Sequence, residues 1–130
     1  MSASWALQQA VYAALVASGD VAERVGDRVF DHVPRDAAFP YLVIGEDDLR
    51  DAGASLSEHL IAVHVWSRAA GLSECKEAAE AVRLALDRAE LAVTGQTLIG
   101  IRHLGTEFAR DADGETLSAT VRFRAVLEPN

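Results

Sequence analysis

The chain has 130 residues, a length that predicts a single domain over residues 1–130. Half of the residues are apolar and a quarter are charged, which is typical of a globular protein and excludes a disordered or collagen-like chain. The net charge of −8 argues against a protein that holds nucleic acid or an anionic membrane on a basic surface. A single cysteine, Cys75, cannot form an internal disulfide, and no basic-then-apolar leader opens the chain, so we expect a cytoplasmic protein.

Two helices are predicted at the start of the chain. Apolar residues recur at helical spacing from Trp5 to Ala17, with Ser2 or Ser4 as the N-cap. The predicted apolar stripe consists of Trp5, Leu7, Val11, Ala14 and Leu15. A short second helix is expected to follow, capped by Asp20 in a capping box with Glu23.

Three strands are predicted in the middle of the chain, over 28–33, 41–46 and 57–66, because β-branched and aromatic residues are enriched there. The third strand alternates, with one face formed by His59, Ile61, Val63 and Val65. Between the last two strands, Asp47–Leu56 is interpreted as a polar loop or as the tip of a long hairpin.

A second long helix is expected from a cap at Ser73 to about Ala89, with a narrow stripe of small residues that suits close packing on a sheet. The C-terminal third predicts a hairpin, with strands over 98–110 and 115–127 around a turn at Asp111–Gly114. The last strand alternates cleanly, and its core positions are Leu117, Ala119, Val121, Phe123, Ala125 and Leu127.

This order of elements predicts an α+β fold. We expect a mostly antiparallel sheet of four to five strands, with two main helices packed on one face, in the order α-α-β-β-β-α-β-β.

Searches for catalytic motifs give little. Cys75 falls on the predicted buried stripe beside Glu74, where burial and negative charge both disfavour a reactive thiolate. His59 and His64 lie five residues apart on one strand, which sends them to opposite faces and disfavours a shared metal ion. Because no phosphate-binding glycine motif is present either, we expect no catalytic residue, no cofactor and no metal.

The run Asp111-x-Asp113-x-Glu115 superficially resembles the start of a calcium-binding loop. Thr116 stands where that loop needs glycine, and Arg122 stands where it needs a bidentate glutamate. A solvated hairpin turn is the better interpretation.

Negative charge is concentrated in two segments. Residues 46–58 carry a net −4 and residues 107–115 a net −3, which together account for almost all of the net charge. Two interpretations remain open at this point: simple solvation of exposed turns, or an anionic surface that must not hold DNA.

Six blocks, in this order, resemble a family of phage tail-completion proteins. They are Leu7–Leu15, Arg28–Pro34, Phe39–Gly45, His59–Arg68, Arg110–Gly114 and Val121–Ala125. The family includes tail terminators and head–tail joining proteins of long-tailed phages and of gene transfer agents. The resemblance covers nearly the whole chain, and each block is a strand, helix or turn signature rather than a catalytic motif.

The resemblance implies a small α+β subunit that assembles into a ring, typically a hexamer. Such a ring caps the completed tail tube and joins it to the head, so the implied partners are further copies of the chain, the tube protein and head-completion or connector proteins. The implied location is the cytoplasm of the producing bacterium and then the particle.

The residues themselves leave a second class open, a small acidic binding or regulatory domain that mimics DNA or inhibits a partner. For the assembly interpretation, loops are where contacts to partners usually lie. We therefore expect assembly contacts in the polar segment, at Asp47, Asp48, Leu49, Arg50 and Asp51.

Overall fold

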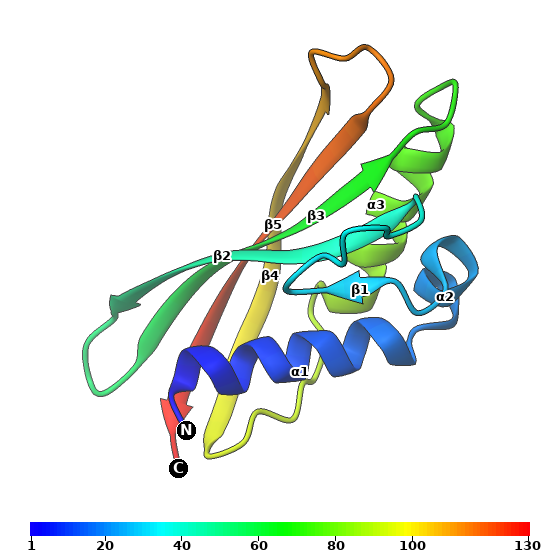
Figure 1. Cartoon of the computed structure of the whole chain (residues 1–130). Coiled ribbons are helices and arrows are strands. Elements are labelled where there is room, and N and C mark those ends of the chain that lie inside the picture. Colours follow the sequence, from blue (N-terminus) through cyan, green and yellow to red (C-terminus); the bar gives the residue numbers. More distant parts are fainter.

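The computed structural model describes residues 1–130 and contains three helices and five strands (Figure 1). The elements run in the order α1 (Ala3–Ala17), α2 (Gly19–Val25), β1 (Val29–Phe30), β2 (Tyr41–Asp51), β3 (Ser57–Ser67), α3 (Ser73–Leu86), β4 (Gln96–Arg110) and β5 (Leu117–Pro129). The predicted α+β class and the predicted order of elements are confirmed. None of the helices has the length and apolar character required to cross a membrane.

All five strands form one sheet in the order β1-β2-β3-β5-β4. The two-residue β1 pairs with β2 in parallel, and every other pairing is antiparallel. β1 and β4 are therefore the two edges of the sheet. The long β4 has one free side, because it pairs only with β5.

The core lies between the helices and one face of the sheet. It is a cluster of 27 buried residues drawn from α1, α2, α3 and the inward positions of the strands. All six predicted core positions of β5 have no exposed surface, whereas the residues between them are half-buried or exposed. The helices therefore cover one face and leave the other partly open.

The structure corrects the predicted start of the helices. Ser2 caps α1, and its hydroxyl accepts a hydrogen bond from the backbone N–H of Trp5 at 3.0 Å. The cap of α2 is Ser18 rather than Asp20, because the Ser18 hydroxyl accepts the N–H of Val21 at 3.2 Å. Trp5 is 46% exposed and does not belong to the buried stripe of α1.

The predicted small-residue stripe of α3 is confirmed, but the helix is shorter than expected. It begins without a side-chain cap at Leu72 and ends at Leu86, where Arg88 adopts a positive φ of 60°. Cys75 is fully buried on this stripe. Burial, with the negative charge of Glu74, raises the pKa of the Cys75 thiol and keeps it protonated.

Two hairpins project from the body of the molecule in opposite directions. Figure 1 shows the β2–β3 turn at the lower left and the β4–β5 turn at the top of the view. The two acidic segments found in the sequence belong to these hairpins, so they lie at opposite ends of the subunit and do not form one continuous patch.

Candidate assembly interface

The five residues predicted to make assembly contacts lie in the last part of β2. After a bulge between Ile44 and Asp47, the segment Asp47–Asp51 pairs with Ser57–Ile61 of β3. The interpretation as a loop is therefore wrong, and the alternative, a long hairpin, is right. Only residues 52–56 form the turn, where Gly53, Ala54 and Ser55 all have positive φ.

Four of these five side chains are displayed on the hairpin. Leu49 is 53% exposed, which is unusual for leucine. Arg50 forms an ion pair with Asp48 at 2.8 Å, and both side chains are more than half exposed. The carboxylate of Asp51 accepts the backbone N–H of Gly53 at 2.8 Å and fixes the turn. An apolar group and a cation are thus displayed on a projecting hairpin.

Asp47, by contrast, points toward the body of the molecule. Its carboxylate lies 3.2 Å from Nδ1 of His59, a side chain with no exposed surface. Nε2 of His59 lies 2.9 Å from the hydroxyl of Ser57, and the hydroxyl of Ser4 in α1 donates to the Asp47 carboxylate. This network connects the first turn of α1 to the stem of the hairpin.

The network follows the hydrogen-bonding order of a Ser–His–Asp triad, which the sequence analysis did not detect because the residues are not in a motif. A triad needs a substrate site beside the nucleophile and the base. Five grooves with volumes from about 180 to about 920 Å³ have no Ser57, His59 or Asp47 in their walls. The geometry therefore supports a structural role, in which each nitrogen of a buried histidine has a partner.

Two further side chains that the sequence raised as possible metal ligands, His64 and Asp113, also have local hydrogen-bond partners. His64 lies on the opposite face from His59, as predicted, with its ring nitrogens 3.1 Å from Thr120 and from Glu46.

The carboxylate of Asp113 accepts the backbone N–H groups of Thr116 and Glu115 and the Thr116 hydroxyl. These hydrogen bonds lower the pKa of Asp113 to about 2 and occupy its oxygens within the turn. No group of three or more His, Cys, Asp or Glu residues is arranged to hold a metal ion.

A groove of about 510 Å³ lies between α1 and β1. Its walls include Trp5, Tyr12 and Phe30, and Asp31 lies at its rim. This groove was not predicted from the sequence, because Trp5 was expected to lie on the buried stripe of the first helix. The sequence does contain a feature that could have indicated it. The α1 segment has no charged residue, although one-quarter of the residues of the chain are charged.

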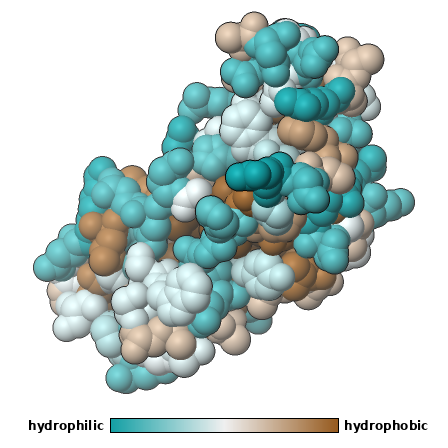
Figure 2. Space-filling model, in the orientation of Figure 1, coloured by the Kyte–Doolittle hydropathy of each residue, from teal (hydrophilic) through white to brown (hydrophobic).

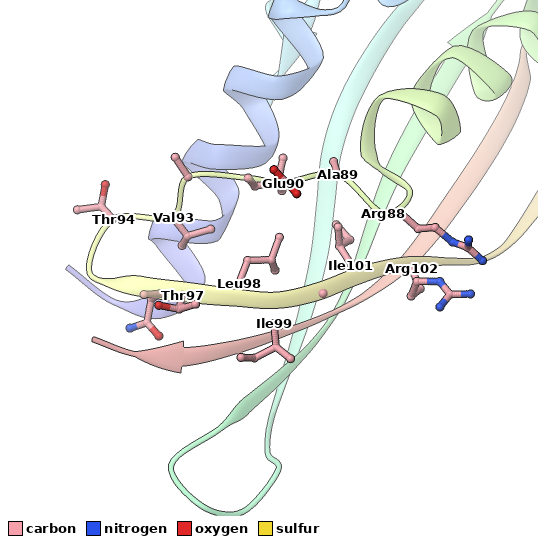
Figure 3. Close-up of a pocket in the computed structure, with 14 residues that line it drawn as sticks. Arg88, Ala89, Glu90, Val93, Thr94, Thr97, Leu98, Ile99, Ile101 and Arg102 are labelled. Atoms are coloured by element: carbon pink, nitrogen blue, oxygen red, sulfur yellow. The ribbon is translucent and has the colours of Figure 1, made fainter.

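A larger hollow of about 920 Å³ lies at the other edge of the sheet, between residues 88–95 and β4. Figure 3 shows Leu98 and Ile101 pointing toward the 88–95 segment, whereas Ile99 points away from it. Arg88 and Arg102 lie together at one end of the hollow. Figure 2 shows mostly pale to brown surface, with some teal, along the lower part of the view, where α1 lies in Figure 1.

Exposed apolar side chains thus lie on β4 at one edge of the sheet and on α1 beside the other edge, and the residues that line the grooves form no recognisable catalytic set. The sequence model of the family described as tail completion protein gp17 matches residues 9–128. The chain belongs to this family. The resemblance inferred from the six sequence blocks is confirmed.

A solved structure supports the same family. The chain is similar to one in the structure titled "Virion of native gene transfer agent (GTA) particle", with 31% sequence identity and a TM-score of 0.90. The alignment covers 98% of each chain. No match was found among curated protein sequences. The tail completion family and this relative in a virion together support a structural role in the tail of a phage or gene transfer agent.

Proposed function

We propose that this chain is a structural assembly protein that caps the completed tail tube as a ring and joins it to the head of a phage or gene transfer agent particle. The observation that carries the proposal is the match to the tail completion protein family over residues 9–128, together with a similar chain in a gene transfer agent virion. In this proposal the ring has six copies, and its other partners are the tube protein and head-completion or connector proteins. The chain acts by binding, without a cofactor or a catalytic step.

The architecture is compatible with ring assembly. A closed ring needs two different surfaces on each subunit, so that the first surface of one copy meets the second surface of the next. The sheet has two distinct edges, β1 and β4. Exposed apolar side chains lie on β4 itself and, near the other edge, on α1. The subunit is made in the cytoplasm of the producing bacterium and becomes part of the head–tail junction.

Within this function, we propose that the β2–β3 hairpin contacts the tail tube or a neighbouring subunit through Asp48, Leu49, Arg50 and Asp51. The exposed Leu49 supplies apolar area. Arg50 supplies a cation that can leave its ion pair with Asp48 and pair with a carboxylate of the partner. Asp47 supports this contact indirectly, because it holds the hairpin stem through His59.

The test is assembly on purified tail tubes, followed by light scattering across a concentration series and by negative-stain microscopy. We expect closed rings and capped tubes. A strict monomer that ignores tubes would contradict the proposed function.

The hairpin is tested separately with Leu49→Ser combined with Arg50→Ser, which we expect to abolish capping while leaving the melting temperature nearly unchanged. Leu84→Ser is the matched control, since Leu84 is also an exposed leucine, 56% accessible, but lies on α3. If the hairpin variant caps tubes as well as the control does, the hairpin is not an assembly contact.

A further inference from the structure

The exposed face of α1 has the character of a buried interface. Trp5, Tyr12 and Val16 are 46%, 45% and 40% exposed, and the helix has no charged residue over its fifteen positions. Tryptophan and tyrosine are enriched at protein interfaces, where charged residues are depleted from the centre. Nothing within the subunit covers this face.

The opposite edge of the sheet carries a second apolar group. Ile99 and Leu104 of β4 are 58% and 56% exposed. Arg102 lies between them in the strand, opposite Arg124 of β5, on the face that the helices leave open. Leu104 lines a small groove on the same face with Leu60 and Ala62. The edge strand thus presents two apolar side chains with a cation between them.

Arg102 forms no ion pair within the subunit, although its charge acts on the Asp87 carboxylate and contributes to lowering the pKa of Asp87, after the hydrogen bond from the His103 N–H and the charge of Arg88. The other arginines of the open face are paired, Arg122 with Glu107 at 3.3 Å and Arg124 with Glu58 at 2.5 Å. Arg102 forms neither an ion pair nor a hydrogen bond, although the chain has many more acids than bases. Arg102 is therefore available to a carboxylate of another molecule. Arg110 is equally unpaired, but it lies away from Ile99 and Leu104, at the far end of β4.

The groove beside α1 offers the complementary charge. Asp31 lies at its rim, and the only side chain that bonds its carboxylate is Gln8, whose amide donates at 3.3 Å. The two surfaces are also of similar length. Trp5 to Tyr12 spans about 10 Å along the helix, and Ile99 to Leu104, between the two bulges of β4, spans about 13 Å.

We propose that the groove between α1 and β1 receives the β4 edge of a second copy of this chain. Ile99 and Leu104 of that copy pack against Trp5 and Tyr12, and its Arg102 forms an ion pair with Asp31. This inference rests on the proposed function, because it assigns the contact that closes the ring. The two surfaces lie at opposite ends of the strand order, so each contact is head-to-tail and leaves one surface of each kind for the next subunit.

The test is reversal of the two charges, with ring formation on tail tubes as the readout. Asp31→Arg and Arg102→Asp each place like charges at every contact, which suppresses association at an interface. Each variant alone should need at least about tenfold more protein to form rings than wild type does, a change of ~1.4 kcal/mol.

An equimolar mixture of the two variants should restore assembly. In alternating rings, the introduced arginine meets the introduced aspartate at one contact, and native Asp31 meets native Arg102 at the next. Rings formed by the mixture must contain the two variants in equal numbers. Mass spectrometry of the assembled rings measures this ratio.

Asp36→Arg and Arg110→Asp are the matched controls. Both residues are exposed and unpaired, Asp36 does not line the groove, and Arg110 lies at the far end of β4 from Ile99, Arg102 and Leu104. We expect both controls to assemble as wild type does. If wild-type rings form and the single reversals form them equally well, or if the mixture is no better than either variant, the inference is overturned while the proposed function stands. If wild-type protein forms no rings on tubes, the proposed function fails, and the inference fails with it.

Discussion

Asp47 accepts hydrogen bonds from α1 and from β3, through Ser4 and the buried His59. Replacing it with alanine leaves Nδ1 of His59 without a partner, and an unsatisfied buried polar group costs about 1–3 kcal/mol. We therefore expect Asp47→Ala to lower the free energy of unfolding by this amount in urea denaturation.

Leu49→Ala is the control for that experiment, because Leu49 lies two residues away and is mostly exposed. Its effect on the free energy of unfolding should stay within about 0.5 kcal/mol. Equal effects of the two substitutions would contradict the structural role of Asp47.

Asp113 predicts a change of stability at acid pH. Its pKa in the folded protein is about 2, because the N–H and hydroxyl of Thr116 and the N–H of Glu115 all donate to the carboxylate. The ordinary value is about 3.9, so the stabilisation is complete above pH ~4 and is lost as the pH falls through about 2. In Asp113→Asn, the free energy of unfolding should change less steeply between pH 4 and pH 2 than in wild type.

Thr116→Val separates the contribution of the Thr116 hydroxyl to the lowered pKa of Asp113 from that of the backbone N–H groups. It removes the hydroxyl donor but keeps both backbone donors, so its pH dependence should fall between those of wild type and Asp113→Asn. A profile of Asp113→Asn identical to that of wild type would overturn the assignment.

At the scale of elements, β2 approaches β3 closely at Gly45, beside the bulge. A Cβ at Gly45 would lie 2.6 Å from the ring of His64, closer than such contacts occur. Gly45→Ala must therefore displace His64 from its hydrogen bonds to Glu46 and Thr120, and we expect a loss of about 1–3 kcal/mol in unfolding free energy.

The double variant Gly45→Ala with His64→Ala should recover part of that loss, because the clashing ring is gone. Gly100→Ala is the matched control in another strand, since nothing lies within 4 Å of a Cβ there. If Gly45→Ala lowers the free energy of unfolding equally in the presence and in the absence of the His64 ring, the contact between Cβ and that ring is not the cause of the loss.

The alternation of β5 was predictable because one face of the strand is buried along its whole length, so the apolar period of two is unbroken from Leu117 to Leu127. The α3 stripe was predictable for the same reason. In both elements, burial against the core produces a regular spacing of apolar residues, and that spacing is visible in the sequence.

The β2 extension was not predictable from composition. Asp47–Asp51 has the residues of a loop, and it is a strand because Ser57–Ile61 supplies its backbone partners. Trp5 was misassigned because an apolar residue at helical spacing has the same pattern whether the subunit itself or a partner covers it. The candidate contacts therefore depend on tertiary neighbours, which local patterns do not contain.

At the scale of the whole molecule, the charge distribution predicts no affinity for duplex DNA. The net charge is −8, and both projecting hairpins carry acidic residues, so the electrostatic contribution to binding is repulsive. Fluorescence anisotropy with a labelled duplex at physiological salt should show no binding. Tight binding that weakens with added salt would contradict this prediction.

The projecting hairpins also determine how members of this fold can diverge. Each turn is closed by its own hydrogen bonds, through Asp51 in one and Asp113 in the other, and neither tip contributes to the core cluster. Because successive strand residues face opposite sides, an inserted or deleted pair on each strand keeps every inward residue inward, whereas a single residue reverses them all. Evolution can therefore adjust the reach of these arms in two-residue steps and match particles of different dimensions without redesigning the subunit.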